Sequence, residues 1–147
     1  MNSTKTLLTL LVCLLPLSGI AGSVDGKSLV CKHNKNDRVV GFMFIDGTVT
    51  ANDISEINLE YRITRFGESL EDKTYRETGP EFRWFLGYWV LNRKTLKLSY
   101  GKPVESSPKE YYVCEVFESF DDYHDKLVKM QSDKQRLLDD ELMQNKI

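Results

Sequence analysis

Apolar and polar side chains alternate along most of residues 28–117, in short runs that turn-forming residues separate. Successive side chains of a β-strand point to opposite faces, so a period of two predicts strands with one buried face. Short connections between such runs favour antiparallel hairpins. The pattern therefore predicts a mainly β fold, an antiparallel sheet that forms a sandwich or small barrel of about seven strands.

Two of the expected strands have the clearest patterns. Residues 38–45 are apolar on both faces, which predicts a covered central strand. Residues 57–66 alternate cleanly and predict a half-buried strand. Asp46-Gly47 and the polar residues 92–95 are each expected to join two strands in a hairpin. The apolar side of the half-buried strand is formed by Ile57, Leu59, Tyr61 and Ile63.

The hydrophobic period changes after residue 117. From residue 120 onward apolar residues recur three or four positions apart, which indicates an amphipathic helix with Ser119 as its N-cap. Charged residues interrupt the apolar stripe toward the C-terminus, so we expect residues 118–147 to form a helix that is frayed at its end. Its first half is expected to dock on the sheet. The alternative is an intermolecular helix, so the protein is expected to be a monomer or a weak dimer through this helix.

The first 23 residues contain the parts of an export signal. Lys5 precedes an apolar run over residues 7–17, and small residues follow it. Pro16 and the small residues interrupt the run short of the roughly 20 apolar residues that a membrane-spanning helix needs. We therefore expect a cleaved signal peptide over residues 1–23, a β domain over residues 24–117, and a periplasmic or secreted protein without a membrane span.

Only two cysteines, Cys31 and Cys114, lie outside this leader. An oxidising compartment permits disulfides, and two cysteines leave a single pairing. Neither cysteine belongs to a Cys-x-x-Cys motif, and both lie in apolar runs typical of strands, which is unfavourable for a reactive thiol. The sequence predicts a structural disulfide between them.

The charge distribution disfavours several functions. Residues 24–117 contain 14 Lys and Arg and 14 Asp and Glu, whereas residues 118–147 contain 5 and 8. Without a basic face, neither nucleic-acid binding nor adsorption to anionic lipid is expected. The chain has no recognised metal-ligand spacing and no activated nucleophile, so we expect no metal and no cofactor. A non-enzymatic protein is favoured, and an unrecognised hydrolase is the alternative.

Aromatic residues gather in residues 82–89. Trp84, Tyr88 and Trp89 are candidates to line a pocket for a small apolar ligand or a sugar at the mouth of a barrel. The alternative is that they only fill the core, because a chain of this size must build its core from such residues.

A small basic edge follows at the expected hairpin. Arg93, Lys94 and Lys97 are candidates to contact an acidic partner protein. Basic hairpin residues also keep sheet edges unpaired, which is the alternative interpretation.

Residues 89–98 and 112–115 contain an apolar strand, Asn-Arg-x-Thr, a return strand and Tyr-x-Cys. This pattern resembles the C-terminal half of small exported bacterial proteins of unknown function. Similar proteins place the partner cysteine in an N-terminal strand, as Cys31 is here. The resemblance implies the hairpin and the disulfide, and it implies no activity.

The Tyr-x-Cys at Tyr112 and Cys114 is also similar to one in the membrane-associated or periplasmic inhibitors of C-type lysozyme, which are small disulfide-linked β-barrels. The Ser-Gly-x-x-Tyr inhibitory loop of that family is not found, since residues 99–102 have these residue types in a different order. This resemblance implies a periplasmic enzyme inhibitor.

These observations lead to one main expectation. The chain is expected to be an exported, non-enzymatic domain that binds a protein partner or a small apolar ligand. The inhibitor and the hydrolase are the alternatives.

Overall fold

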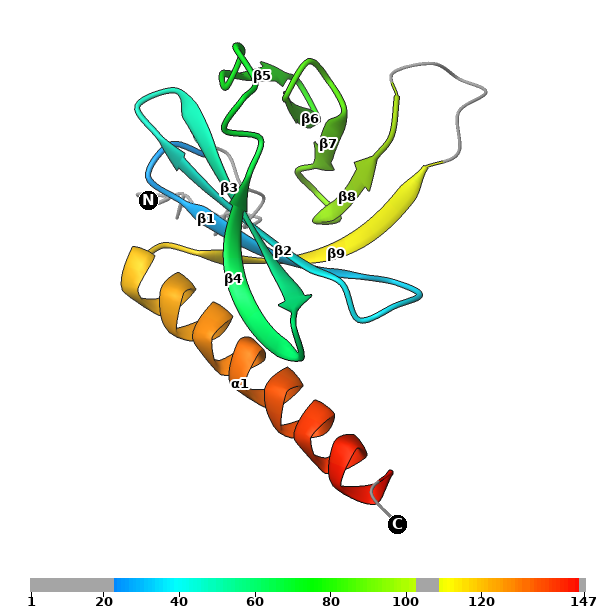
Figure 1. Cartoon of the computed structure of the whole chain (residues 1–147). Coiled ribbons are helices and arrows are strands. Elements are labelled where there is room, and N and C mark those ends of the chain that lie inside the picture. Colours follow the sequence, from blue (N-terminus) through cyan, green and yellow to red (C-terminus); the bar gives the residue numbers. More distant parts are fainter. Residues whose placement is uncertain (1–22, 103–108, 146–147) are drawn as a thin grey trace, which may run out of the picture.

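The computed structural model describes residues 23–102 and 109–145, so the predicted signal peptide lies outside the described residues except for Ser23. Within these ranges the chain forms nine strands and one C-terminal helix, α1 (Phe120–Gln144), as Figure 1 shows. The strands are β1 (Ser28–His33), β2 (Val39–Ile45), β3 (Thr48–Ile57), β4 (Glu60–Phe66), β5 (Tyr75–Thr78), β6 (Glu81–Trp84), β7 (Trp89–Asn92), β8 (Lys97–Tyr100) and β9 (Glu110–Phe117).

All nine described strands belong to one antiparallel sheet with the order β4-β3-β2-β1-β9-β8-β7-β6-β5. The sheet thus consists of two meanders, β1 to β4 and β5 to β9, which meet where β1 pairs with β9. Cys31 and Cys114 are cross-strand partners at this joint, and a disulfide links them. The predicted pairing is confirmed, and a disulfide is consistent with an oxidising compartment.

The sheet curls into a half-barrel (Figure 1). Its curl brings the segment before β5 back to the start of β3, where Thr48 and Thr74 form an isolated antiparallel bridge. The backbone N–H of Val49 also donates to the carbonyl oxygen of Lys73 at 2.8 Å. The predicted mainly β fold with a C-terminal helix is confirmed, and the sheet is curled on itself.

The larger hydrophobic core lies inside the curl and is rich in aromatic residues. The Phe42 ring makes edge-to-face contacts with Trp84 at 4.9 Å and with Trp89 at 5.0 Å between ring centroids. Phe42 comes from the first meander and both tryptophans come from the second. These aromatic contacts therefore hold the two meanders together across the inside of the half-barrel.

Helix α1 packs on the opposite face of the sheet. It begins as predicted, because the Ser119 side chain accepts a hydrogen bond from the Asp122 N–H. Tyr123 and Leu127 are buried in a second core against the first meander. The first half of the helix thus docks on its own sheet, as expected.

The helix also covers part of the exposed edge of β4. The Gln131 side chain donates to the Tyr61 carbonyl oxygen at 2.7 Å, and the Tyr61 N–H donates to the Gln135 side chain at 2.8 Å. Unpaired backbone groups at a sheet edge can pair with another chain, so these contacts protect the edge.

The predicted strand over residues 57–66 is confirmed for Glu60–Phe66, as β4, but its start is wrong. Asn58 and Leu59 have φ angles of 54° and 63° and form the turn between β3 and β4. Leu59 is 56% exposed, whereas the alternation had placed it on the buried side. A leucine in the left-handed region gives no turn signal, and a two-residue turn does not interrupt the alternation.

The contact of Tyr123 with the sheet predicts a pH dependence of stability. Burial raises the pKa of Tyr123 to about 12, while the hydrogen bond that its oxygen accepts from Asn52 opposes this rise. A raised pKa means that the stabilising contribution of the neutral phenol is complete below pH 10.0 and is lost as the pH rises towards 12.

We therefore expect the free energy of unfolding to fall between these pH values less in Tyr123→Phe than in the unmodified protein. Urea unfolding followed by circular dichroism measures this difference. Tyr112, whose pKa burial also raises, is present in both proteins and cancels in the comparison. An equal fall in both proteins would contradict the assignment to Tyr123.

Candidate ligand-binding site

An apolar cavity of about 310 Å³ opens at one rim of the half-barrel. Strands and turns from both meanders contribute to its wall, so the cavity exists only because the sheet curls. We call it the aromatic cavity; its lining residues are Arg38, Phe66, Leu70, Phe85, Leu86, Tyr88, Trp89 and Tyr100.

Three aromatic residues of the second meander form a continuous wall of the aromatic cavity. The rings of Trp89 and Tyr100, which are cross-strand partners in β7 and β8, lie 4.4 Å apart between centroids with an interplanar angle of 31°. The Tyr88 ring lies 6.5 Å from that of Tyr100. Tyr88 and Tyr100 are only half-buried, so part of their surface remains open to a ligand.

The turn between β6 and β7 forms the rim of the cavity in a strained conformation. Phe85 and Leu86 have φ angles of 49° and 57°, and Gly87 follows with 81°. Residues with a Cβ rarely adopt this region, and strain of this kind is common at binding sites. The turn places Leu86 outward, where 64% of its surface is exposed. The sequence analysis did not predict a turn at Phe85, because phenylalanine is not a typical turn residue.

Within residues 23–102 and 109–145, Arg38 is the only charged residue that lines the aromatic cavity. Its guanidinium nitrogens lie 3.5 Å from a Glu110 carboxylate oxygen and 3.9 Å from an Asp53 carboxylate oxygen. Glu110 also accepts a hydrogen bond from the Tyr112 hydroxyl at 3.0 Å. These carboxylates hold Arg38 at the edge of the cavity, and neither of them lines it.

Burial affects two titratable groups beside Arg38. It raises the pKa of the Asp53 carboxyl, and the positive charge of Arg38 opposes this rise. Burial is also the main cause of the raised pKa of Tyr112. Asp53 and Tyr112 lie behind Arg38 and do not line the cavity. The cavity wall therefore consists of aromatic and aliphatic side chains and one guanidinium, which is an arrangement suited to holding a ligand.

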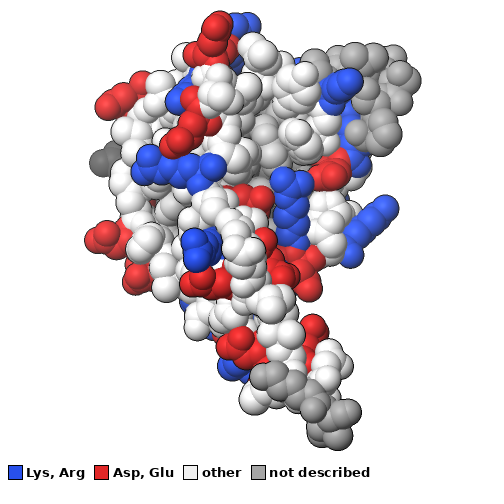
Figure 2. All heavy atoms as spheres, viewed as in Figure 1, with Lys and Arg blue, Asp and Glu red and all other residues white. Residues whose placement is uncertain are grey.

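Among the described residues, no group of three or more His, Cys, Asp and Glu side chains is arranged to hold a metal ion. The charged side chains on the face shown in Figure 2 are interspersed, with basic and acidic residues next to each other. This face therefore has no large patch of one sign.

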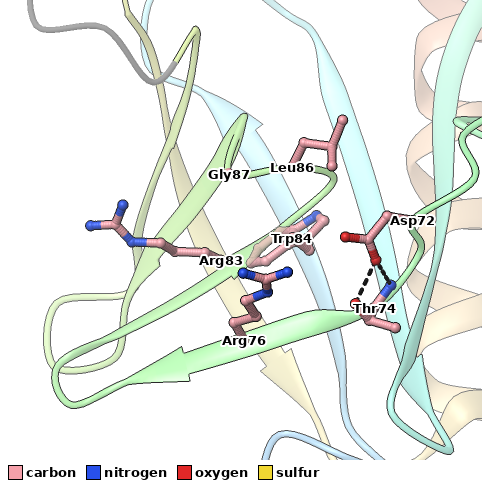
Figure 3. A pocket seen from close by; sticks show the side chains of 7 residues that line it. All are labelled: Asp72, Thr74, Arg76, Arg83, Trp84, Leu86 and Gly87. Carbon is pink, nitrogen blue, oxygen red and sulfur yellow. Dashed lines mark hydrogen bonds between the residues drawn. The ribbon is translucent and has the colours of Figure 1, made fainter.

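The structure brings together two of the three predicted ligand-binding residues. Tyr88 and Trp89 line the aromatic cavity, whereas Trp84 lines a neighbouring cavity (Figure 3). All three also contribute to the larger core, so these aromatic residues both fill the core and form cavity walls. Tyr100 joins them through its pairing with Trp89. The hairpin predicted at residues 92–95 could have indicated that Tyr100 lies beside Trp89.

The predicted basic edge is only partly accessible. The Arg93 guanidinium forms an ion pair with Glu77, donates to the Gly79 carbonyl oxygen at 3.1 Å, and lies 4.7 Å above the centroid of the Phe82 ring. Lys94 and Lys97 are exposed. Arg93, which follows β7, thus connects this strand to the β5–β6 hairpin. The two lysines are charges on the surface.

Sequence reasoning missed Arg38, Phe66 and Leu70 as lining residues. They belong to the first meander and to the segment that follows it, and they reach the cavity only through the curl of the sheet. Alternation predicts which side of a strand is buried, but it contains no signal for which distant strands meet.

Comparisons with protein-family models, with curated proteins and with solved structures find no match to this chain. In the part of the chain that the structure describes, no helix has the length and apolar character needed to cross a membrane.

Proposed function

We propose that this protein is an exported, non-enzymatic binding module that holds a small, largely apolar ligand in the aromatic cavity. The observation that carries this proposal is the wall of the cavity, in which one guanidinium accompanies seven apolar or aromatic side chains. Pockets for small ligands typically combine such walls with a few polar groups. The disulfide, which is consistent with an oxidising compartment, supports the exported location.

The composition of the cavity wall favours binding over hydrolysis. A hydrolytic site needs a nucleophile or a general acid and base within reach of the substrate. The described residues that line the aromatic cavity include no carboxylate, histidine, serine or cysteine. We therefore prefer a ligand-binding module to the hydrolase. We also prefer it to the lysozyme inhibitor, because the inhibitory loop of that family has no counterpart in the sequence.

The binding proposal is tested with N-phenyl-1-naphthylamine, a neutral apolar dye whose fluorescence rises in apolar surroundings. We expect the dye to bind the full chain, and we expect Tyr88→Ala and Tyr100→Ala each to weaken binding by about fivefold, because each removes an aromatic wall worth about 1 kcal/mol. A fluorescence titration gives the dissociation constants. Native and denaturing masses of the purified protein then identify a ligand that co-purifies with it.

Tyr111→Ala is the matched control. Tyr111 is 49% exposed in β9 and does not line the aromatic cavity. If the dye does not bind, or if Tyr111→Ala weakens its binding as much as Tyr88→Ala does, the aromatic cavity is not the ligand site.

A further inference from the structure

A second cavity, of about 290 Å³, lies beside the open end of the β5–β6 hairpin (Figure 3). It shares only Leu86 with the aromatic cavity. More charged residues line it than line the aromatic cavity. We call it the arginine cavity; its lining residues are Asp72, Thr74, Arg76, Arg83, Trp84, Leu86 and Gly87.

Two arginines line this cavity from adjacent strands. Arg76 in β5 and Arg83 in β6 are direct cross-strand partners, an arrangement of like charges that destabilises a sheet. Arg83 is compensated by Glu81, whose carboxylate accepts hydrogen bonds from it at 2.7 and 3.2 Å. Arg76 has no ion-pair partner within 4.0 Å among the described residues. Its positive charge acts on the nearby Asp72 carboxyl, but no direct ion pair within the described residues occupies the hydrogen-bond donors of its guanidinium.

Trp84 supplies a second unsatisfied group in the same wall. The side chain is only 1% exposed, and its indole N–H has no hydrogen-bond acceptor among the residues that the structure describes. Edge-to-face contacts with Phe42 at 4.9 Å and Phe44 at 5.3 Å hold the ring, so it is not free to turn towards another acceptor. A buried donor without a partner costs free energy, which an acceptor in the cavity would recover.

Asp72 limits the charge of the ligand. Its carboxylate accepts hydrogen bonds from the N–H and the hydroxyl of Thr74, drawn as dashed lines in Figure 3. These hydrogen bonds are the main cause of its lowered pKa, so Asp72 is ionised at neutral pH. The positive charge of Arg76 contributes to the same lowering. A ligand with two negative charges would face the Asp72 carboxylate, and Arg76 is the lining cation that forms no ion pair within 4.0 Å among the described residues.

We propose that the arginine cavity binds a small organic monocarboxylate. The Arg76 guanidinium holds the carboxylate, because its planar fork matches the two carboxylate oxygens. The Trp84 indole N–H donates to an oxygen of the same ligand. Figure 3 shows the indole between Arg76 and Leu86, so the apolar part of the ligand lies against Leu86. This site is independent of the ligand proposed for the aromatic cavity.

The two tryptophans of the chain separate the two sites in one experiment, because Trp84 lines the arginine cavity and Trp89 lines the aromatic cavity. A nitrogen–proton correlation spectrum of the full chain resolves their indole N–H signals, and Trp84→Phe or Trp89→Phe assigns them. Sodium benzoate is the probe, and neutral benzamide is its uncharged counterpart. We expect benzoate to shift the Trp84 signal in a saturable manner, and benzamide to leave it unchanged.

Arg76→Gln removes the guanidinium and is expected to weaken benzoate binding by about tenfold or more, since hydrogen bonds to charged groups are the stronger ones. Arg136→Gln on helix α1 is the matched control and should leave the affinity unchanged, because Arg136 does not line the cavity. An unmoved Trp84 signal, a shift of the Trp89 signal alone, or equal affinity in Arg76→Gln would overturn the proposal. Before benzoate is added, a Trp89 signal at the same position in Arg76→Gln as in the unmodified protein shows that the variant has folded.

Discussion

Replacing Cys31 and Cys114 together by alanine is expected to lower the free energy of unfolding by about 4.5 kcal/mol. The disulfide joins residues that are 83 positions apart, so its loss frees a long loop in the unfolded chain. The effect is large because the stability of a whole domain is only about 5 to 15 kcal/mol. The disulfide also lies where β1 pairs with β9. Among the described strands, this is the only pair that joins the two meanders.

Urea unfolding of the variant and of the unmodified protein, followed by tryptophan fluorescence, measures the difference. The reduced unmodified protein is the control, because it lacks the covalent link and retains both sulfur atoms. It should lose nearly the same stability as the alanine variant. A loss below about 1 kcal/mol in both would show that strand pairing alone holds the joint.

Gly41→Ala is expected to destabilise the protein by about 2 to 3 kcal/mol and to displace the first half of helix α1. A Cβ atom at residue 41 would lie 2.4 Å from the Tyr123 hydroxyl oxygen and 3.1 Å from two carbon atoms of its ring. Tyr123 is buried and its hydroxyl accepts a hydrogen bond from Asn52 at 2.9 Å, so the ring has little room to move. The glycine is thus needed for the close approach of the helix.

A double-mutant cycle isolates this contact. Tyr123→Phe removes the hydroxyl oxygen, so Gly41→Ala should cost less in the Tyr123→Phe background than in the unmodified protein. Urea unfolding of the four proteins measures the coupling. Equal costs in both backgrounds would show that the clash with the hydroxyl is not the cause.

Local patterns in the sequence predicted much of the fold. The period of two marked the strands, the change of period after residue 117 marked the helix, and two cysteines outside the leader left one possible disulfide. The turns at Asn58-Leu59 and Phe85-Leu86 were missed because three of these four residues are not typical of left-handed backbone.

The candidate sites depended on long-range geometry that these patterns do not contain. Tyr88 and Trp89 were found from the aromatic stretch, since a dense group of rings must pack somewhere. Arg38 and Arg76 were missed, because the curl of the sheet and the register of β5 with β6 decide what each guanidinium faces. Charge alone does not distinguish them from other surface arginines.

The pairing of β1 with β9 also affects when the sheet can be completed during protein synthesis. Protein synthesis proceeds from the N-terminus, so β1 to β4 are complete well before β9 is made. During that interval the edge of β1 that will pair with β9 has no strand beside it, and such an edge promotes aggregation of unfinished chains. Until β9 is in place, this edge of β1 can therefore pair with strands of other chains.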